Sequence, residues 1–163
     1  MLKKLHIVFA LLCAVAMSQF PEFHQQYTQR IGGALDELTL QVAALDERAR
    51  NAGMDRYDYV RHFQNNSDNI VKGEGDAMLA TLSRQQRLAI AYERLTEAPW
   101  YMIVVETAFH LEPDVAANTA QVFVPAVPIS FSGAVHTFAG FLIGYLLPAM
   151  LGSLVPRRRS RAA

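Results

Sequence analysis

Cysteine and charged residues are both scarce in this chain of 163 residues. A single cysteine, Cys13, excludes a disulfide scaffold and a cysteine-rich zinc site. Charged residues make up 18% of the chain, which is below the soluble average, and the formal net charge is zero. These values exclude a strongly basic nucleic-acid-binding protein, and the 52% hydrophobic content excludes a disordered chain.

Acidic residues are missing from both ends of the sequence. All fifteen lie between Glu22 and Asp114, a stretch that also holds nine basic residues and therefore carries a net charge of −6. The other six basic residues are terminal: Lys3, Lys4, Arg157, Arg158, Arg159 and Arg161. The neutral total is thus the sum of an acidic middle and two basic ends.

Two apolar segments separate the acidic middle from the basic ends. Residues 129–155 form an uncharged run of twenty-seven residues, which is longer than the ~20 residues that a helix needs to cross a bilayer. Residues 5–20 are also uncharged but extend only about 24 Å as a helix, so this span needs extra residues or a thin bilayer. We expect transmembrane helices over 1–23 and 127–156. A cleaved signal peptide is the alternative for the first, because Ala14-Val15-Ala16 matches a cleavage site.

The basic ends predict the orientation of these helices. Because basic residues stay on the cytoplasmic side, both termini are expected in the cytoplasm, with 157–163 as a basic tail. Residues 24–126 would then form an extracytoplasmic domain, which in a bacterium is periplasmic. The sequence therefore predicts a multi-pass protein of the bacterial inner membrane, with the lipid bilayer as a partner and no nucleic acid.

The middle of the chain has the pattern of helices. Apolar residues recur at alternating spacings of four and three, the 3.5-residue period of helices that wrap on each other. The seam consists of Ile31, Leu35, Leu38, Val42 and Leu45. A helix over 75–95 is its expected partner in an antiparallel hairpin, and a turn over 65–75, with Gly73 and Gly75 as helix breakers, is expected before it. Self-association through the seam is the alternative. The predicted fold class is an all-α membrane protein with two transmembrane helices flanking a mainly helical extracytoplasmic domain.

Two consecutive glycines, Gly32 and Gly33, interrupt the seam. Each costs about 1 kcal/mol inside a helix. The pair therefore predicts a helix break, or a docking point where another backbone comes very close.

Small residues at every fourth position form a ridge on each apolar segment. The ridges are Ala10, Ala14 and Ser18 in the first, and Ser132, His136, Gly140 and Gly144 in the second. Small residues let helices approach closely in lipid, so we expect the two spans to pack together or on a partner protein. His136 is ionisable and suggests a proton relay or a cofactor ligand. A neutral imidazole bonded to Ser18 or Ser132 is the structural alternative.

Motifs of catalysis are few. The sequence has no H-E-x-x-H, no P-loop and no nucleophile elbow. Glu106 and His110 share one helical face and suit a metal or an acid–base pair, although a hydrogen-bonded structural pair is commoner. We expect no catalytic residue, no cofactor and no metal, and an enzymatic role is disfavoured.

One segment carries a family resemblance. It comprises SQFPEF (18–23), QQY (25–27), QRIGG (29–33) and DEL (36–38). This segment resembles the start of a proteobacterial family of small inner-membrane proteins that is catalogued only as a domain of unknown function. The resemblance implies a membrane location and no particular activity.

The sequence leaves three functions open. The first is a non-catalytic accessory or assembly subunit of an inner-membrane complex, which needs a membrane protein partner or a homo-oligomer. The second is an oligomeric channel or transporter component lined by His136. The third is a membrane enzyme or metal-binding protein that uses Glu106 and His110.

Overall fold

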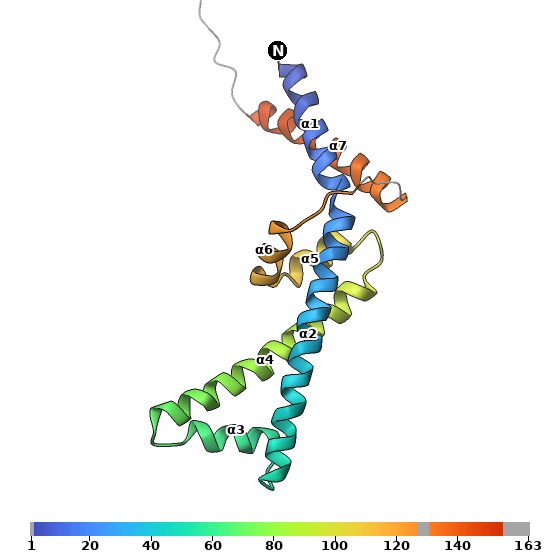
Figure 1. Ribbon diagram of the computed structural model, residues 1–163. Helices are drawn as coiled ribbons and strands as arrows, with labels where there is room; N and C mark the ends of the chain where they lie inside the picture. Colours follow the sequence, from blue (N-terminus) through green and yellow to red (C-terminus); the bar gives the residue numbers. More distant parts are fainter. Residues whose placement is uncertain (1, 127–130, 155–163) are drawn as a thin grey trace, which may run out of the picture. The chain divides into compact units, whose positions relative to one another are not determined.

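Every regular element in the described part of the chain is a helix (Figure 1). The computed structural model describes residues 2–126 and 131–154. Its helices are α1 (Leu2–Ser18), α2 (Phe20–Asn51), α3 (Arg56–Gln64), α4 (Asn69–Glu97), α5 (Ile103–Phe109), α6 (Pro113–Gln121) and α7 (Phe131–Leu154). The predicted all-α fold class is confirmed.

Two helical stretches are long and apolar enough to cross a membrane. One lies in His6–Asn51, where α1 leads into α2, and the other is Phe131–Pro148 in α7. Only Gln19 separates α1 from α2, and its backbone keeps helical bonding, since its carbonyl oxygen accepts the N–H of Phe23 at 3.0 Å. The described parts of both predicted membrane-spanning segments are therefore helical, apart from the single residue Gln19. The predicted basic tail, 157–163, lies outside the described residues.

The chain divides into two compact units. Unit 1 comprises Met1–Gln25 and Phe123–Ala163, and it contains α1, the beginning of α2 and α7. Unit 2 comprises Gln26–Val122 and contains the rest of α2 with α3, α4, α5 and α6.

Within unit 2, the helices α2, α3 and α4 form the sides of a triangle (Figure 1). α4 crosses α2 where the ring of Tyr92 lies against Gly32, and the two helices then diverge toward α3. A core cluster joins all three helices: Val42, Leu45, Val60 and Leu82, with Tyr59 and Met78 packed against it. The seam of α2 thus packs on two helices, where the sequence predicted one antiparallel partner.

The seam residues of α2 are buried as a helical stripe. Ile31, Leu38, Val42 and Leu45 are buried, and Leu35 is half-buried. The stripe continues on both sides, through Tyr27 and Ala49. Unit 2 therefore folds around one apolar face of α2.

The predicted break at Gly32 and Gly33 is wrong, because α2 continues through both residues. Burial of the stripe on either side of them outweighs the cost of two glycines. Gly32 is nevertheless a point of close contact, since a Cβ there would lie 2.8 Å from Cε2 of Tyr92. Nothing lies within 4 Å of a Cβ at Gly33.

Gly53 ends α2 in a Schellman motif. Its N–H donates to Arg50 O at 2.9 Å, and the N–H of Met54 donates to Ala49 O at 3.0 Å. Gly53 has a φ of 69°, a conformation that costs glycine least. The sharp stop returns the chain at once into α3.

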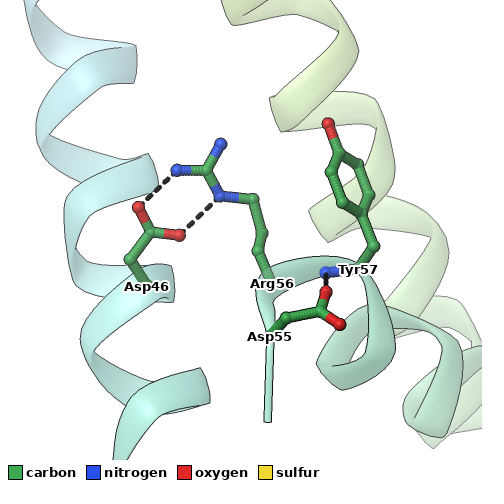
Figure 2. Close-up of polar contacts among 4 residues, drawn as sticks. All are labelled: Asp46, Asp55, Arg56 and Tyr57. Carbon is green, nitrogen blue, oxygen red and sulfur yellow. Dashed lines mark hydrogen bonds and ion pairs between the residues drawn. The ribbon is translucent and has the colours of Figure 1, made fainter.

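The start of α3 is held by two carboxylates (Figure 2). The side chain of Asp55 caps the helix by accepting the N–H of Tyr57 at 2.7 Å. Arg56, the first residue of α3, forms a two-pronged ion pair with Asp46 of α2. Hydrogen bonding to this guanidinium lowers the pKa of the Asp46 carboxyl below its ordinary value.

The expected turn over 65–75 is shorter than predicted. α4 already begins at Asn69, because the side chain of Asp68 accepts the N–H of Ile70 at 2.8 Å. Gly73 and Gly75 therefore lie inside α4. Gly75 is buried where α4 meets α3, since a Cβ there would lie 2.7 Å from the backbone nitrogen of Gln64.

Candidate functional site

In unit 1, the structure brings the two small-residue ridges together. Ala10, Ala14, Ser18, His136, Gly140 and Gly144 are buried, and Ser132 is half-buried. A Cβ on Gly140 would lie 2.5 Å from the backbone oxygen of Cys13, and one on Gly144 would lie 2.7 Å from Cα of Ala10. The backbones of α1 and α7 thus touch directly, in the manner of small-residue packing in membranes.

The outward faces of this helix pair are apolar. Large hydrophobic side chains are exposed on both helices: Ile7, Val8, Phe9, Leu11, Leu12 and Val15 on α1, and Phe138, Leu142, Ile143, Leu146 and Leu147 on α7. Lipid chains solvate such side chains well. The pair therefore encloses Ser18 and His136 in its tightly packed helix–helix contact and has an outer surface that is compatible with lipid.

His136 lies inside the α1–α7 contact. Its Nδ1 is 2.7 Å from the carbonyl oxygen of Ser132, and because a carbonyl only accepts, Nδ1 carries the hydrogen and donates. The ring of Phe20 stacks on the imidazole, with 6.5 Å between centroids and 15° between planes. Ser18 does not serve as its partner, since the Ser18 hydroxyl donates to Val15 O at 2.7 Å. His136 is thus oriented by its own helix and by an aromatic ring.

The motif segment that begins at Ser18 holds the chain that leads into α7. Oε1 of Gln19 accepts the N–H of Ala126 at 3.0 Å, and Nε2 of Gln19 donates to the Ser18 hydroxyl at 3.1 Å. Phe23 meets Phe123 edge to face, with 5.9 Å between centroids. Sequence reasoning marked this motif but gave Gln19 and Phe123 no role. The sequence signal that could have indicated this role is a polar, uncharged side chain, Gln19, at the end of an apolar segment.

In unit 2, Tyr27 fixes the loop between α5 and α6. It is fully buried, its hydroxyl donates to His110 O at 3.0 Å, and it accepts the N–H of Glu112 at 2.8 Å. Burial raises the pKa of the Tyr27 phenol, although the bond from the Glu112 backbone acts in the opposite direction. The phenol therefore stays neutral, and able to donate, throughout the physiological range.

Glu106 and His110 lie together next to this loop. Nδ1 of His110 is 3.3 Å from Oε2 of Glu106 and 3.1 Å from the Glu106 carbonyl oxygen. Close by in sequence, Glu112 lies 3.6 Å from Nε of Arg87. Among the described residues, no group of three or more His, Cys, Asp or Glu side chains is arranged to hold a metal ion. These contacts are suited to holding α4, α5 and the α5–α6 loop together.

The comparison with protein families gives a match over nearly the whole chain. A family profile covers residues 1–161, and its description is that of a protein of unknown function. No curated protein and no solved structure matches the chain. The resemblance to a family of unknown function is thereby confirmed.

Proposed function

The chain belongs to the DUF2937 family of proteins of unknown function, and from that starting point we propose that it is a non-catalytic accessory or assembly subunit of an inner-membrane complex. In this proposal α1 and α7 anchor the chain, both termini are cytoplasmic and unit 2 is periplasmic. The acidic middle and the basic ends of the sequence support this orientation.

The observation that carries the proposal is that the potentially reactive side chains make bonds within the fold. His136 donates to Ser132 within the helix pair, and Tyr27 bonds to the α5–α6 loop. Nδ1 of His110 bonds to the backbone oxygen of Glu106 and lies 3.3 Å from the Glu106 carboxylate. Side chains that make such structural bonds hold helices and loops together, which supports an architectural role over a catalytic one.

The same geometry favours an anchor over an oligomeric channel. A channel built from several two-helix subunits needs polar groups on the outer faces of those helices to line a path. His136, the histidine of α7, is instead buried in the helix pair and stacks against Phe20. With the exception of Tyr145, which is 43% exposed, the exposed large side chains described on both helices are apolar.

Native mass spectrometry of the full chain, extracted from its own membranes in mild detergent, tests the proposal. We expect a stoichiometric membrane protein partner, or a defined homo-oligomer, to be extracted with it. A clean monomer under conditions that preserve known complexes from the same membranes would contradict the proposal.

Reporter fusions test the orientation separately. A reporter that is active only outside the cytoplasm should be active when inserted at Asn66, in the exposed turn between α3 and α4. A fluorescent protein that folds only in the cytoplasm should be bright at either terminus. A bright insertion at Asn66 would overturn the periplasmic placement of unit 2.

A further inference from the structure

On α5, polar side chains are buried and apolar side chains are exposed, which is the reverse of the usual arrangement. Glu106 and His110 are half-buried with 3.3 Å between the carboxylate and Nδ1, and Thr107 is almost fully buried. Val105 and Phe109, one turn apart, point outward instead, and Phe109 is 81% exposed. A helix in contact with water on its outer side has the opposite arrangement.

Neighbouring residues extend this apolar surface. We define the α5 face as four exposed side chains: Tyr101, Val105, Phe109 and Leu111. Trp100 adjoins it, 45% exposed, with its ring edge to face on Tyr101 at 5.6 Å between centroids. Exposed apolar residues grouped in this way mark a contact surface, unlike single exposed residues elsewhere.

We propose that the α5 face lies in the headgroup region of the lipid bilayer. Tryptophan and tyrosine concentrate at that depth, because each combines an apolar ring with a polar group. Phe109, Val105 and Leu111 supply apolar area that the acyl boundary accepts.

The chain connections place the bilayer within reach of the α5 face. The α5–α6 loop is bonded to Tyr27, nine residues after α1 ends at Ser18. α6 ends at Gln121, ten residues before α7 begins at Phe131, and ten residues extend at most about 35 Å. The segment is thus tethered to both apolar helices, which favours lipid over a separate protein as its contact.

The contact does not depend on anionic lipid. From Leu95 to Pro156 the chain contains no lysine and no arginine. Basic residues are what attract a protein surface to phosphatidylserine or other anionic headgroups. Arg87 of α4 reaches the neighbouring loop, but it lies 3.6 Å from Glu112, which offsets its charge. Apolar burial is therefore the source of binding, and neutral phosphatidylcholine is a sufficient partner.

Trp100 is the single tryptophan of the chain and reports on this surface directly. We would reconstitute the full chain in phosphatidylcholine vesicles whose acyl chains carry bromine either near the headgroup or at the bilayer centre. We expect stronger quenching of Trp100 by the shallow bromine, weak quenching by aqueous acrylamide, and the same result when anionic lipid is added.

The matched control moves the tryptophan to α3, in the double variant Trp100→Phe, Tyr57→Trp. Tyr57 is 56% exposed, similar to Trp100, but is not part of the α5 face. We expect no quenching by brominated lipid at position 57 and an acrylamide quenching constant several-fold larger than that of Trp100. Equal lipid quenching at the two positions would overturn the assignment to this face.

A third variant places the probe on the face itself, as Trp100→Phe, Phe109→Trp. An aromatic exchange at a side chain this exposed leaves the fold intact, and quenching by shallow bromine should equal or exceed that of Trp100. Quenching by acrylamide without lipid quenching would overturn the proposal, because the face would be in water. Protection from both quenchers would also overturn it, because a protein, such as a second copy, would then cover the face.

Discussion

The backbone oxygen of Cys13 lies where a side chain on Gly140 would have to begin, only 2.5 Å from an ideal Cβ. Real carbon atoms do not approach an oxygen this closely, so only glycine fits without moving a helix. In lipid there is no gain from excluding water, and helices associate through such direct backbone packing. Gly140 is therefore the residue on which the α1–α7 contact depends most directly.

Replacing Gly140 by leucine should separate α1 from α7. Overpacking at a close contact costs about 1–3 kcal/mol, and here the obstacle is backbone that cannot turn aside. The measurement is unfolding of the full chain in mixed detergent micelles by circular dichroism, with a lower midpoint expected for Gly140→Leu. The control is Ala134→Leu, an exposed position on the same helix. An equal loss in both variants would show that the packing at Gly140 is not the cause.

The adjacent glycines of α2 should respond differently to alanine. At Gly33 the space is open, so Gly33→Ala should stabilise the chain by up to about 1 kcal/mol through helix propensity. At Gly32 the new Cβ would meet the Tyr92 ring at 2.8 Å, which must shift, so Gly32→Ala should gain less or destabilise. Chemical denaturation of the two variants side by side measures the difference. A larger gain at Gly32 than at Gly33 would contradict the contact with Tyr92.

Periodic features of the fold could be predicted from the sequence. The 3.5-residue seam through Leu38 and Val42 and the four-residue ridge through Gly140 each report one helical face, and the structure buries both. Local glycine rules failed at Gly32 and Gly75, because a penalty of about 1 kcal/mol per glycine is small beside the burial of a long helix. Periodicity also identifies a buried face without identifying what covers it, so the division of the seam between α3 and α4 was not foreseen.

The contacts that position the candidate site could not be predicted in the same way. Tyr27 and the carbonyl oxygen of His110 are 83 residues apart, and no local pattern links a phenol to a distant backbone atom. Gln19 and Ala126 are 107 residues apart. The pairing of Glu106 with His110 was predictable, because four residues bring side chains onto one helical face.

Replacing Tyr27 by phenylalanine should destabilise unit 2 by about 1–3 kcal/mol. The change removes the donor to His110 O and the acceptor of the Glu112 N–H, and it leaves both backbone groups without that partner. Denaturant unfolding at neutral pH measures the loss. Tyr57→Phe, at an exposed position, is the control and should change stability little. A loss in Tyr57→Phe as large as that in Tyr27→Phe would contradict the proposed clamp.

The effect of Tyr27 should also depend on alkaline pH. Burial raises the pKa of its phenol above the ordinary value of about 10, so folding favours the protonated form. The stabilisation is complete below pH 10 and is lost as the pH rises through the folded-state pKa. The difference in unfolding free energy between wild type and Tyr27→Phe should therefore shrink above pH 10. A difference that grows in that range would contradict the direction of the shift.

Asp46 should stabilise the α2–α3 junction at neutral pH and not in acid. Its ion pair with Arg56 lowers its pKa in the folded state, so its contribution is present above about pH 4 and disappears as the pH falls through the lowered pKa. Because both side chains are partly exposed, Asp46→Asn should cost only about 0.5–1 kcal/mol at pH 7. The unfolding curves of wild type and variant should approach each other as the pH falls below 4. The control is Asp36→Asn, at an exposed position on the same helix, which should show a smaller difference at pH 7. A cost for Asp46→Asn that persists undiminished at pH 2 would rule out the ion pair as its cause.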